Sequence, residues 1–289
     1  MEKPNKDLFE KIVKIAQNRG FVFNASSIYG GLRSSYDYGP LGASLKDNIS
    51  QLWWKSLKTS ELKIYPVDTA IIQSTEVWKA SGHLSEFADP MVECKNCNSR
   101  FRSDSNLDNV CCDQQELTDP KNFNLMFETN IGPVKNDNSQ VFLRPETAQG
   151  IFVNFENVLR TMRAKLPFGI ANIGKSFRNE ITPGQFIFRT REFEQMEIEF
   201  FCKEEDSEEW MDYWINKRLK WYKDLGLKED FLRLRPHDSD ELAHYAQSTV
   251  DIEYLYPWGW GELEGIADRG NYDLKAHQEK SGKDLTYFD

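Results

Sequence analysis

The sequence contains no apolar run that approaches the roughly 18 residues needed to cross a bilayer. Its first seven residues are mostly polar and charged, so they lack the apolar core of a secretory signal. Only five of the 289 residues are cysteines, an odd and small number that does not suggest a disulfide framework. These absences predict a cytoplasmic protein with no membrane segment. The length is sufficient for one large domain or two ordinary ones.

Basic charge is also scarce, with 36 lysines and arginines against 46 acidic residues and a formal net charge of −10. Proteins that bind nucleic acids usually carry a basic footprint, so charge alone does not predict such a partner. The acidic run 204–209 contributes much of the excess and is typical of a solvated helix start. A modest basic cluster at Arg160, Arg163, Lys165 and Lys175 is more typical of a helix surface than of an RNA site.

Hydrophobic periodicity predicts helices over residues 6–19, 41–57, 148–166 and 206–225, and short strands at 141–143 and 258–267. Gly20, Pro167 and Gly226 mark helix ends, and Asp206 with Glu209 forms a capping-box-like pair. Strands and helices interleave irregularly along the chain. This order favours an α+β fold in which helices pack against a mostly antiparallel sheet.

Residues 177–197 carry the most informative pattern, because arginines, glutamates and aromatic residues recur along two predicted strands. A Pro-Gly pair predicts a turn over 182–185 that joins these strands. Side chains alternate faces along a strand, so Arg178 and Glu180 are expected on one face of the first strand. One face of the second strand is expected to carry Arg189, Arg191, Phe193, Gln195 and Glu197. The pattern fits either a site for phosphate or carboxylate groups or a solvated hairpin with cross-strand ion pairs.

Residues 88–122 differ in composition from the rest of the chain, because they are polar, contain many turn-forming residues and carry cysteines. Cys94 and Cys97 have the spacing of metal ligands, whereas the second half of a site would be the adjacent pair Cys111 and Cys112. Adjacent cysteines rarely bind one zinc ion comfortably. The expected zinc ligands are therefore Cys94, Cys97 and Cys112, and the alternative is a chance cysteine pair without zinc.

The two-stranded segment resembles motif 2 of the class II aminoacyl-tRNA synthetases, in the form carried by the glycyl-tRNA synthetases. The matching residues are 174–181 and 189–193. Further segments that resemble this family are 29–32, 36–42, 80–84, 123–127, 143–150, 260–265 and 267–269. The resemblance covers nearly the whole chain. It implies a class II catalytic domain over 1–289 with an antiparallel sheet flanked by helices, a cysteine-containing insertion at about 88–122, and a homodimer built on motif 1.

The resemblance also implies the reaction and the residues that perform it. Glycine and ATP would form glycyl-adenylate, and glycine would then pass to tRNA(Gly), with Arg178 as the catalytic residue and Glu262 as a ligand for Mg2+. The implied ATP-binding residues are Arg178, Asn179, Glu180, Phe188, Arg189, Thr190, Arg191, Glu192, Phe193, Glu262 and Leu263. The implied glycine-binding residues are Arg100, Glu146, Phe193, Glu194, Gln195, Met196 and Glu197.

Without the family, ordinary roles would be preferred for the two central carboxylates. Glu146 would be an exposed first-turn glutamate favoured by the helix dipole, and Glu197 a cross-strand partner of an arginine. In their glycyl-like contexts, both argue against a proline, threonine or serine specificity.

The resemblance includes no third class II motif and no anticodon-binding domain before the chain ends at Asp289. We therefore expect a catalytic domain that is incomplete at its C-terminus and weak or inactive alone. The alternative is a non-catalytic module that binds glycine, adenylate or tRNA.

Overall fold

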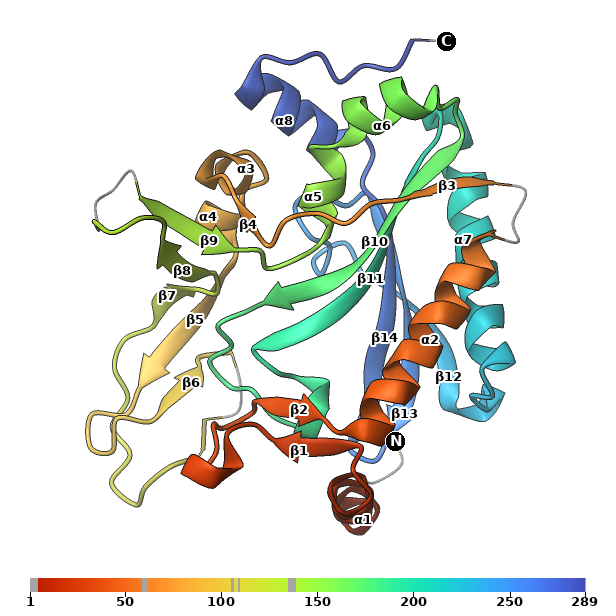
Figure 1. Cartoon of the computed structure of the whole chain (residues 1–289). Coiled ribbons are helices and arrows are strands. Elements are labelled where there is room, and N and C mark those ends of the chain that lie inside the picture. The colour runs from red at the N-terminus through yellow and green to blue at the C-terminus, as the bar shows by residue number, and fades with distance from the viewer. Residues whose placement is uncertain (1–4, 59–61, 105–106, 109, 135–138, 289) are drawn as a thin grey trace.

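The structure is a computed structural model that describes residues 5–58, 62–104, 107–108, 110–134 and 139–288. Two three-stranded sheets form its centre, with strand orders β11-β10-β3 and β12-β13-β14. Every pairing in them is antiparallel except that of β3 with β10. The edge strands β11 and β14 face one another (Figure 1). The bounds of these strands are β3 (Lys63–Pro66), β10 (Phe168–Phe177), β11 (Glu192–Phe201), β12 (Leu232–Pro236), β13 (Ser248–Tyr256) and β14 (Gly259–Asp268).

Two helices cover one face of this centre, α2 (Pro40–Lys58) and α7 (Ser207–Asp224). Their buried tryptophans, Trp53 and Trp214, pack with Ile252 of β13 in a hydrophobic core. The opposite face carries the shorter helices α5 (Ala148–Phe152) and α6 (Phe155–Met162). The α+β architecture predicted from the sequence is confirmed.

Smaller units surround this centre. Residues 88–124 form a separate three-stranded sheet at the left of Figure 1, where the sequence predicts an insertion. No helix within the described ranges is long and apolar enough to span a bilayer. The remaining helices and strands are α1 (Lys6–Asn18), β1 (Val22–Asn24), β2 (Tyr36–Tyr38), β4 (Ile72–Gln73), α3 (Thr75–Ala80), α4 (His83–Glu86), β5 (Ala88–Glu93), β6 (Arg100–Arg102), β7 (Lys121–Asn124), β8 (Phe127–Asn130), β9 (Gln140–Leu143) and α8 (Tyr272–Ser281).

The single helix predicted over 148–166 is wrong in its continuity, because the chain breaks into α5 and α6 at Asn154. The Asn154 side-chain amide donates to the Gly150 carbonyl at 2.9 Å, a local bond that competes with the helical ladder. The capping box predicted at the start of α7 is also not formed. Asp206 occupies the N-cap position, but its side chain makes no capping hydrogen bond.

The strand ends predicted for residues 177–197 need correction as well. β10 ends at Phe177 and β11 begins at Glu192, so Arg178 and Glu180 lie beyond the first strand, and Arg189 and Arg191 lie before the second. The Asn179 N–H bonds to the Leu125 carbonyl at 2.7 Å, which draws the chain away from the ladder. The residues between the strands therefore form a loop from 178 to 191 rather than a tight hairpin turn.

Candidate active site

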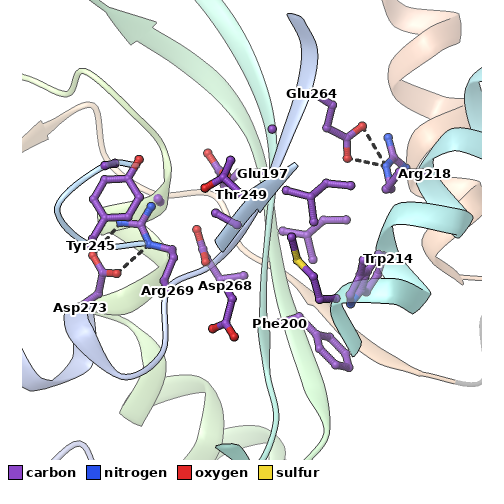
Figure 2. Close-up of a pocket in the computed structure, with 18 of the residues that line it drawn as sticks. Glu197, Phe200, Trp214, Arg218, Tyr245, Thr249, Glu264, Asp268, Arg269 and Asp273 are labelled. Carbon is purple, nitrogen blue, oxygen red and sulfur yellow. Dashed lines mark hydrogen bonds and ion pairs between the residues drawn. The ribbon is translucent and has the colours of Figure 1, made fainter. Parts of the chain in front are cut away.

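A cavity of about 870 Å³ opens between β11 and β14, within the size range of small-molecule sites. Tyr245, Arg269 and Asp273 lie on one side of the strands in Figure 2, whereas Phe200 and Trp214 lie on the other. The polar side is formed by β11, β14, α5, α8 and the loops that enter them. Glu146, Glu197, Arg269 and Asp273 converge on this side, whereas Arg218 and Glu264 form an ion pair on the other side.

Two carboxylates, those of Glu146 and Glu197, form the centre of the polar side. Glu146 lies just before α5, and Glu197 lies on the half-buried face of β11. Thr147 connects them, because its hydroxyl donates to Glu197 Oε2 at 3.1 Å while Thr147 directly follows Glu146. Glu146 Oε2 is 3.6 Å from His83 Nε2, and its Oε1 accepts from Gln149 Nε2 at 3.0 Å.

The surroundings give these two carboxylates different pKa values. Burial acts to raise the pKa of Glu146, but His83, Arg269 and the Gln149 amide outweigh it and hold that pKa well below its ordinary value. Burial and the charge of Glu146 raise the pKa of Glu197 to about 7, against the hydrogen bond from Thr147. Burial also raises the pKa of Glu199, the next residue on the same face of β11. We call the part of the cavity around Glu146 and Glu197 the pit. Glu146 is negatively charged at neutral pH and Glu197 ionises near neutrality, so the two carboxylates attract a cation.

Arg269 forms the wall of this pit and was assigned no role in the sequence analysis. Its guanidinium donates to both oxygens of Asp273, at 2.7 and 2.9 Å, and its carbon lies 3.6 Å from the centroid of the Tyr245 ring. Residues 267–269 had been noted only as a family-like segment. The signal for Glu199 was its alternation with Gln195 and Glu197.

Arg178 lines the cavity immediately after β10. Its Nε donates to the Pro145 carbonyl at 3.0 Å, and its guanidinium carbon lies 5.4 Å from the Phe87 ring centroid and 5.2 Å from that of Phe193. Within the described ranges, no residue accepts a hydrogen bond from its two terminal nitrogens. The side chain is therefore fixed at its stem, while its charged end is available to an anion.

Glu262 faces a point in β14 where a side chain is missing. A Cβ added at Gly265 would lie 3.2 Å from Glu262 Oε1 and 3.5 Å from Asp251 Oδ1. The other oxygen of Asp251 accepts from His237 at 2.8 Å and from Arg235 at 3.0 Å. Burial and the charge of Asp251 raise the pKa of Glu262. Carboxylate oxygens of Glu262 and Asp251 thus approach the same position in β14, and carboxylate oxygen is the ligand type that a hard divalent cation prefers.

The cavity includes some of the predicted residues and not others. Those that line it are Glu146, Arg178, Glu194, Gln195, Met196, Glu197, Glu262 and Leu263. Strand alternation nevertheless places Glu194 and Met196 on the face of β11 opposite Glu197, and Glu194 forms an ion pair with Lys46 of α2 at 2.7 Å. Their contact with glycine stays a prediction.

Most of the predicted ATP-binding loop is outside the cavity lining. The residues concerned are Asn179, Glu180, Phe188, Arg189, Thr190, Arg191, Glu192 and Phe193. The Phe188 ring packs 4.9 Å from Tyr256 and 5.2 Å from Trp258, measured between ring centroids. Arg100 lies on β6, where its Nε contacts Glu93 at 2.7 Å, and it is not brought to the cavity lining. The roles of these residues stay predictions.

Four thiols gather in the separate sheet of residues 88–124. The Sγ atoms of Cys94, Cys97, Cys111 and Cys112 all lie within 4.8 Å of one another. The three predicted ligands Cys94, Cys97 and Cys112 lie together, and the structure adds Cys111 to the group; zinc binding stays a prediction. The Cys111 Sγ lies 3.9 Å from that of Cys112, which is itself 3.7 Å from that of Cys94. Four thiols at this spacing fit a tetrahedral metal site.

Comparison with known proteins shows the family to which the chain belongs. The family model described as the tRNA synthetase class II core domain (G, H, P, S and T) matches residues 127–270. The Glycine--tRNA ligase of Caldanaerobacter subterraneus subsp. tengcongensis is 50% identical over 99% of this chain and 68% of its own length. That of Bifidobacterium longum is 52% identical over 96% of this chain and 62% of its own length. The chain therefore spans about two thirds of the length of these relatives.

A solved structure shares the fold. The cytoplasmic Serine-tRNA ligase from Naegleria fowleri, in complex with AMP, superposes with a TM-score of 0.65. The match covers 91% of this chain and 48% of that chain, at 16% sequence identity. At that identity, the likeness extends to the fold alone.

Proposed function

This chain belongs to the glycine–tRNA ligase family, and on that premise we propose how its residues bind and activate glycine. The reaction joins glycine to the α-phosphate of ATP, releases pyrophosphate, and then passes glycine from the adenylate to tRNA(Gly). The observation that carries the proposal is the convergence of two buried carboxylates, Glu146 and Glu197, on the cavity that Arg178 also lines. Together they provide separate partners for the two ends of a zwitterion.

The pit of Glu146 and Glu197 receives the glycine ammonium group, and Arg178 receives the carboxylate. Glycine offers no side chain to grip, so selectivity rests on excluding larger amino acids from the space beside its α-carbon. Arg269 is suited to be the wall that excludes them, because Asp273 and Tyr245 hold its guanidinium on one edge and one face.

In the first step, an oxygen of the glycine carboxylate attacks the α-phosphorus, and the bond from that phosphorus to the pyrophosphate oxygen breaks. A carboxylate is already a competent nucleophile, so the step needs no general base. Catalysis then consists of alignment and of neutralising the charge that develops on the phosphate. Arg178 performs both tasks, because its stem is fixed by Pro145 and its charged end is available.

ATP is held by the loop between β10 and β11 and by β14. We assign Phe193 to the adenine face, Glu180 to the adenine edge and Arg189 to the outer phosphates, following the family resemblance. Glu262, with Asp251 near it, would hold Mg2+. The ion would supply positive charge to the phosphates.

Three further features complete the proposal. The four thiols of Cys94, Cys97, Cys111 and Cys112 hold a structural zinc ion in the separate sheet. A second copy of the chain covers the apolar side chains that α1 and α2 leave exposed. These are Leu8, Ile12, Ile15, Leu41, Leu45 and Leu52, each 44–59% exposed. A cytoplasmic location agrees with five free cysteines.

The test is calorimetric binding of a non-hydrolysable glycyl-adenylate analogue beside its alanyl counterpart. We expect glycyl binding to exceed alanyl binding by more than tenfold, about 1.4 kcal/mol. Arg178→Ala is expected to weaken glycyl binding by about a hundredfold, whereas the control Arg160→Ala, on the exposed surface of α6, leaves it unchanged. Preference for the alanyl analogue would refute glycine, and binding of neither would refute the site.

A further inference from the structure

Gln149 lies in the first turn of α5 and is completely buried. Its side-chain nitrogen donates to Glu146 Oε1 at 3.0 Å and to Asp273 Oδ1 at 2.9 Å. Its side-chain oxygen accepts from His277 Nε2 at 2.7 Å. Both amide hydrogens and the carbonyl are thus engaged, each with a different partner.

This set of partners requires an amide at position 149. An amide nitrogen carries two hydrogens, and here each one faces a carboxylate that can only accept. The carbonyl oxygen needs a donor, and the His277 ring nitrogen Nε2, 2.7 Å away, is the group placed to donate to it. A glutamate in the same space would have no hydrogen to offer either carboxylate.

The three partners come from two distant parts of the sequence. Glu146 precedes α5, whereas Asp273 and His277 belong to α8. Asp273 in turn holds Arg269, with which it forms two hydrogen bonds. One buried amide therefore links the carboxylate proposed for the glycine ammonium group to the arginine proposed as the wall of the pit.

We propose that Gln149 is a positioning residue for glycine recognition, which holds Glu146 at a fixed place relative to the Arg269–Asp273 pair. The inference rests on the proposed function, because it assigns Glu146 and Arg269 to the glycine site. In this proposal, selectivity for glycine depends on a side chain that does not touch the substrate. The helix α8 also contributes to recognition, because its Asp273 and His277 hold the Gln149 amide.

The test uses two variants of similar volume. Gln149→Glu keeps the shape and removes both donors, and Gln149→Met removes every hydrogen bond. We expect each to weaken binding of the glycyl-adenylate analogue at least tenfold, with binding of a non-hydrolysable ATP analogue within twofold of wild type. Loss of stability alone would instead lower the binding stoichiometry and the melting temperature without this difference between the two ligands.

A control glutamine lies on α8, the helix that carries Asp273 and His277. The Gln278 side-chain oxygen accepts from the Leu285 N–H at 2.9 Å, in a partly buried contact. Gln278→Glu therefore makes the same amide-to-carboxylate change at a residue that does not contact Glu146. It is expected to leave both affinities unchanged. His277→Phe removes only the donor that orients the Gln149 amide and is expected to weaken glycyl-adenylate binding about threefold. That variant carries the test if both Gln149 variants fail to fold.

The two proposals fail in different ways. If the wild-type chain does not bind the glycyl-adenylate analogue, the proposed function is wrong. If wild type binds it and the folded Gln149 variants bind it within threefold of wild type, the role of Gln149 is wrong and the proposed function stands. An equal loss of affinity for both ligands would likewise overturn the positioning role.

Discussion

Arg269 lies over the ring of Tyr245, with its guanidinium carbon 3.6 Å from the ring centroid, and this stacking fixes the plane of the guanidinium. Asp273 fixes its edge through two hydrogen bonds, and the Asp273 side chain is only 2% exposed. The planar guanidinium can bond to the Asp273 carboxylate with its edge and stack on the Tyr245 ring with its face, whereas a lysine ammonium cannot do both. The wall of the pit is therefore held on two sides before any ligand binds.

We predict that Arg269→Ala lowers the free energy of unfolding by about 3–5 kcal/mol, because it leaves the buried Asp273 carboxylate with the Gln149 amide but without its charged partner. The measurement is urea denaturation followed by circular dichroism. The control is Lys220→Ala, which removes an exposed pair with Asp224 and is expected to cost less than about 1 kcal/mol. Equal costs for the two variants would contradict the structural importance of the Arg269 pair.

We predict that glycine affinity falls as the pH is lowered through 7. The ammonium group binds the ionised form of Glu197, whose pKa burial and the charge of Glu146 raise to about 7. Below that value the folded apo protein holds a proton on Glu197, which must be lost for glycine to bind. The expected dissociation constant for glycine is roughly tenfold larger at pH 6 than at pH 8.

The measurement for this pH dependence is glycine titration at several pH values with wild type and Glu197→Gln. The variant should bind glycine weakly at every pH, with a nearly flat profile between pH 6 and 8. Glu146 has its pKa held low, so it stays ionised throughout this range and should not add to the profile. A wild-type profile as flat as that of the variant would exclude Glu197 as the titrating group.

The sequence predicted the alternation along β11 well, because a half-buried strand imposes a strict period of two. Phe193, Gln195 and Glu197 lie on the face that was expected to carry them. The sequence pattern also predicted that Arg178 and Glu180 lie on the first strand, but β10 ends at Phe177. Their true position depends on the hydrogen bond from Asn179 to Leu125, a contact between distant residues that no local pattern reports.

The resemblance to the glycyl-tRNA synthetases is confirmed, and it located Glu146 and Glu197, for which local chemistry alone favoured ordinary roles. Neither approach pointed to Gln149 or Asp273, which contact the cavity residues Glu146 and Arg269. Both are buried polar residues, and the hydrogen bond that joins them connects positions 124 residues apart in the sequence. Such residues acquire meaning only when the fold brings α5 and α8 together. The break at Asn154 was missed for a simpler reason, since periodicity continues across it.

We predict about one zinc ion per chain, lost on replacing any cysteine of the four-thiol group. Cys112→Ser should reduce the zinc content measured by mass spectrometry and lower the melting temperature, because the ligands then no longer close a tetrahedral site. Cys202→Ser is the matched control, since Cys202 is a free cysteine outside the group. Purified wild-type protein without zinc, and unable to take up zinc or cobalt after reduction, would contradict the prediction.

The Arg144 side chain lies against Gly174 of β10, in the space that a side chain at position 174 would need. A Cβ at Gly174 would overlap Arg144 Nη2. Arg144 is 1% exposed and donates to the Lys175 carbonyl at 2.7 Å and to the Thr69 carbonyl at 2.8 Å, so it has little freedom to move. Gly174→Ala is therefore expected to lower the free energy of unfolding by about 3 kcal/mol, from overpacking and displaced hydrogen bonds.

The same substitution should also weaken the adenylate site. The Arg144 carbonyl accepts from the Phe177 N–H at 2.9 Å, so a shift of Arg144 displaces the end of β10 from which Arg178 projects. Gly184→Ala is the control in the same loop-and-strand segment, because a Cβ there meets nothing within 4 Å, and its cost should stay within about 0.5 kcal/mol. If Gly174→Ala matched this control in urea denaturation and in glycyl-adenylate binding, Arg144 would not be the rigid support of Arg178. A selective loss in Gly174→Ala would instead show that the position of Arg178, the residue proposed for catalysis, depends on a glycine three positions before the end of β10.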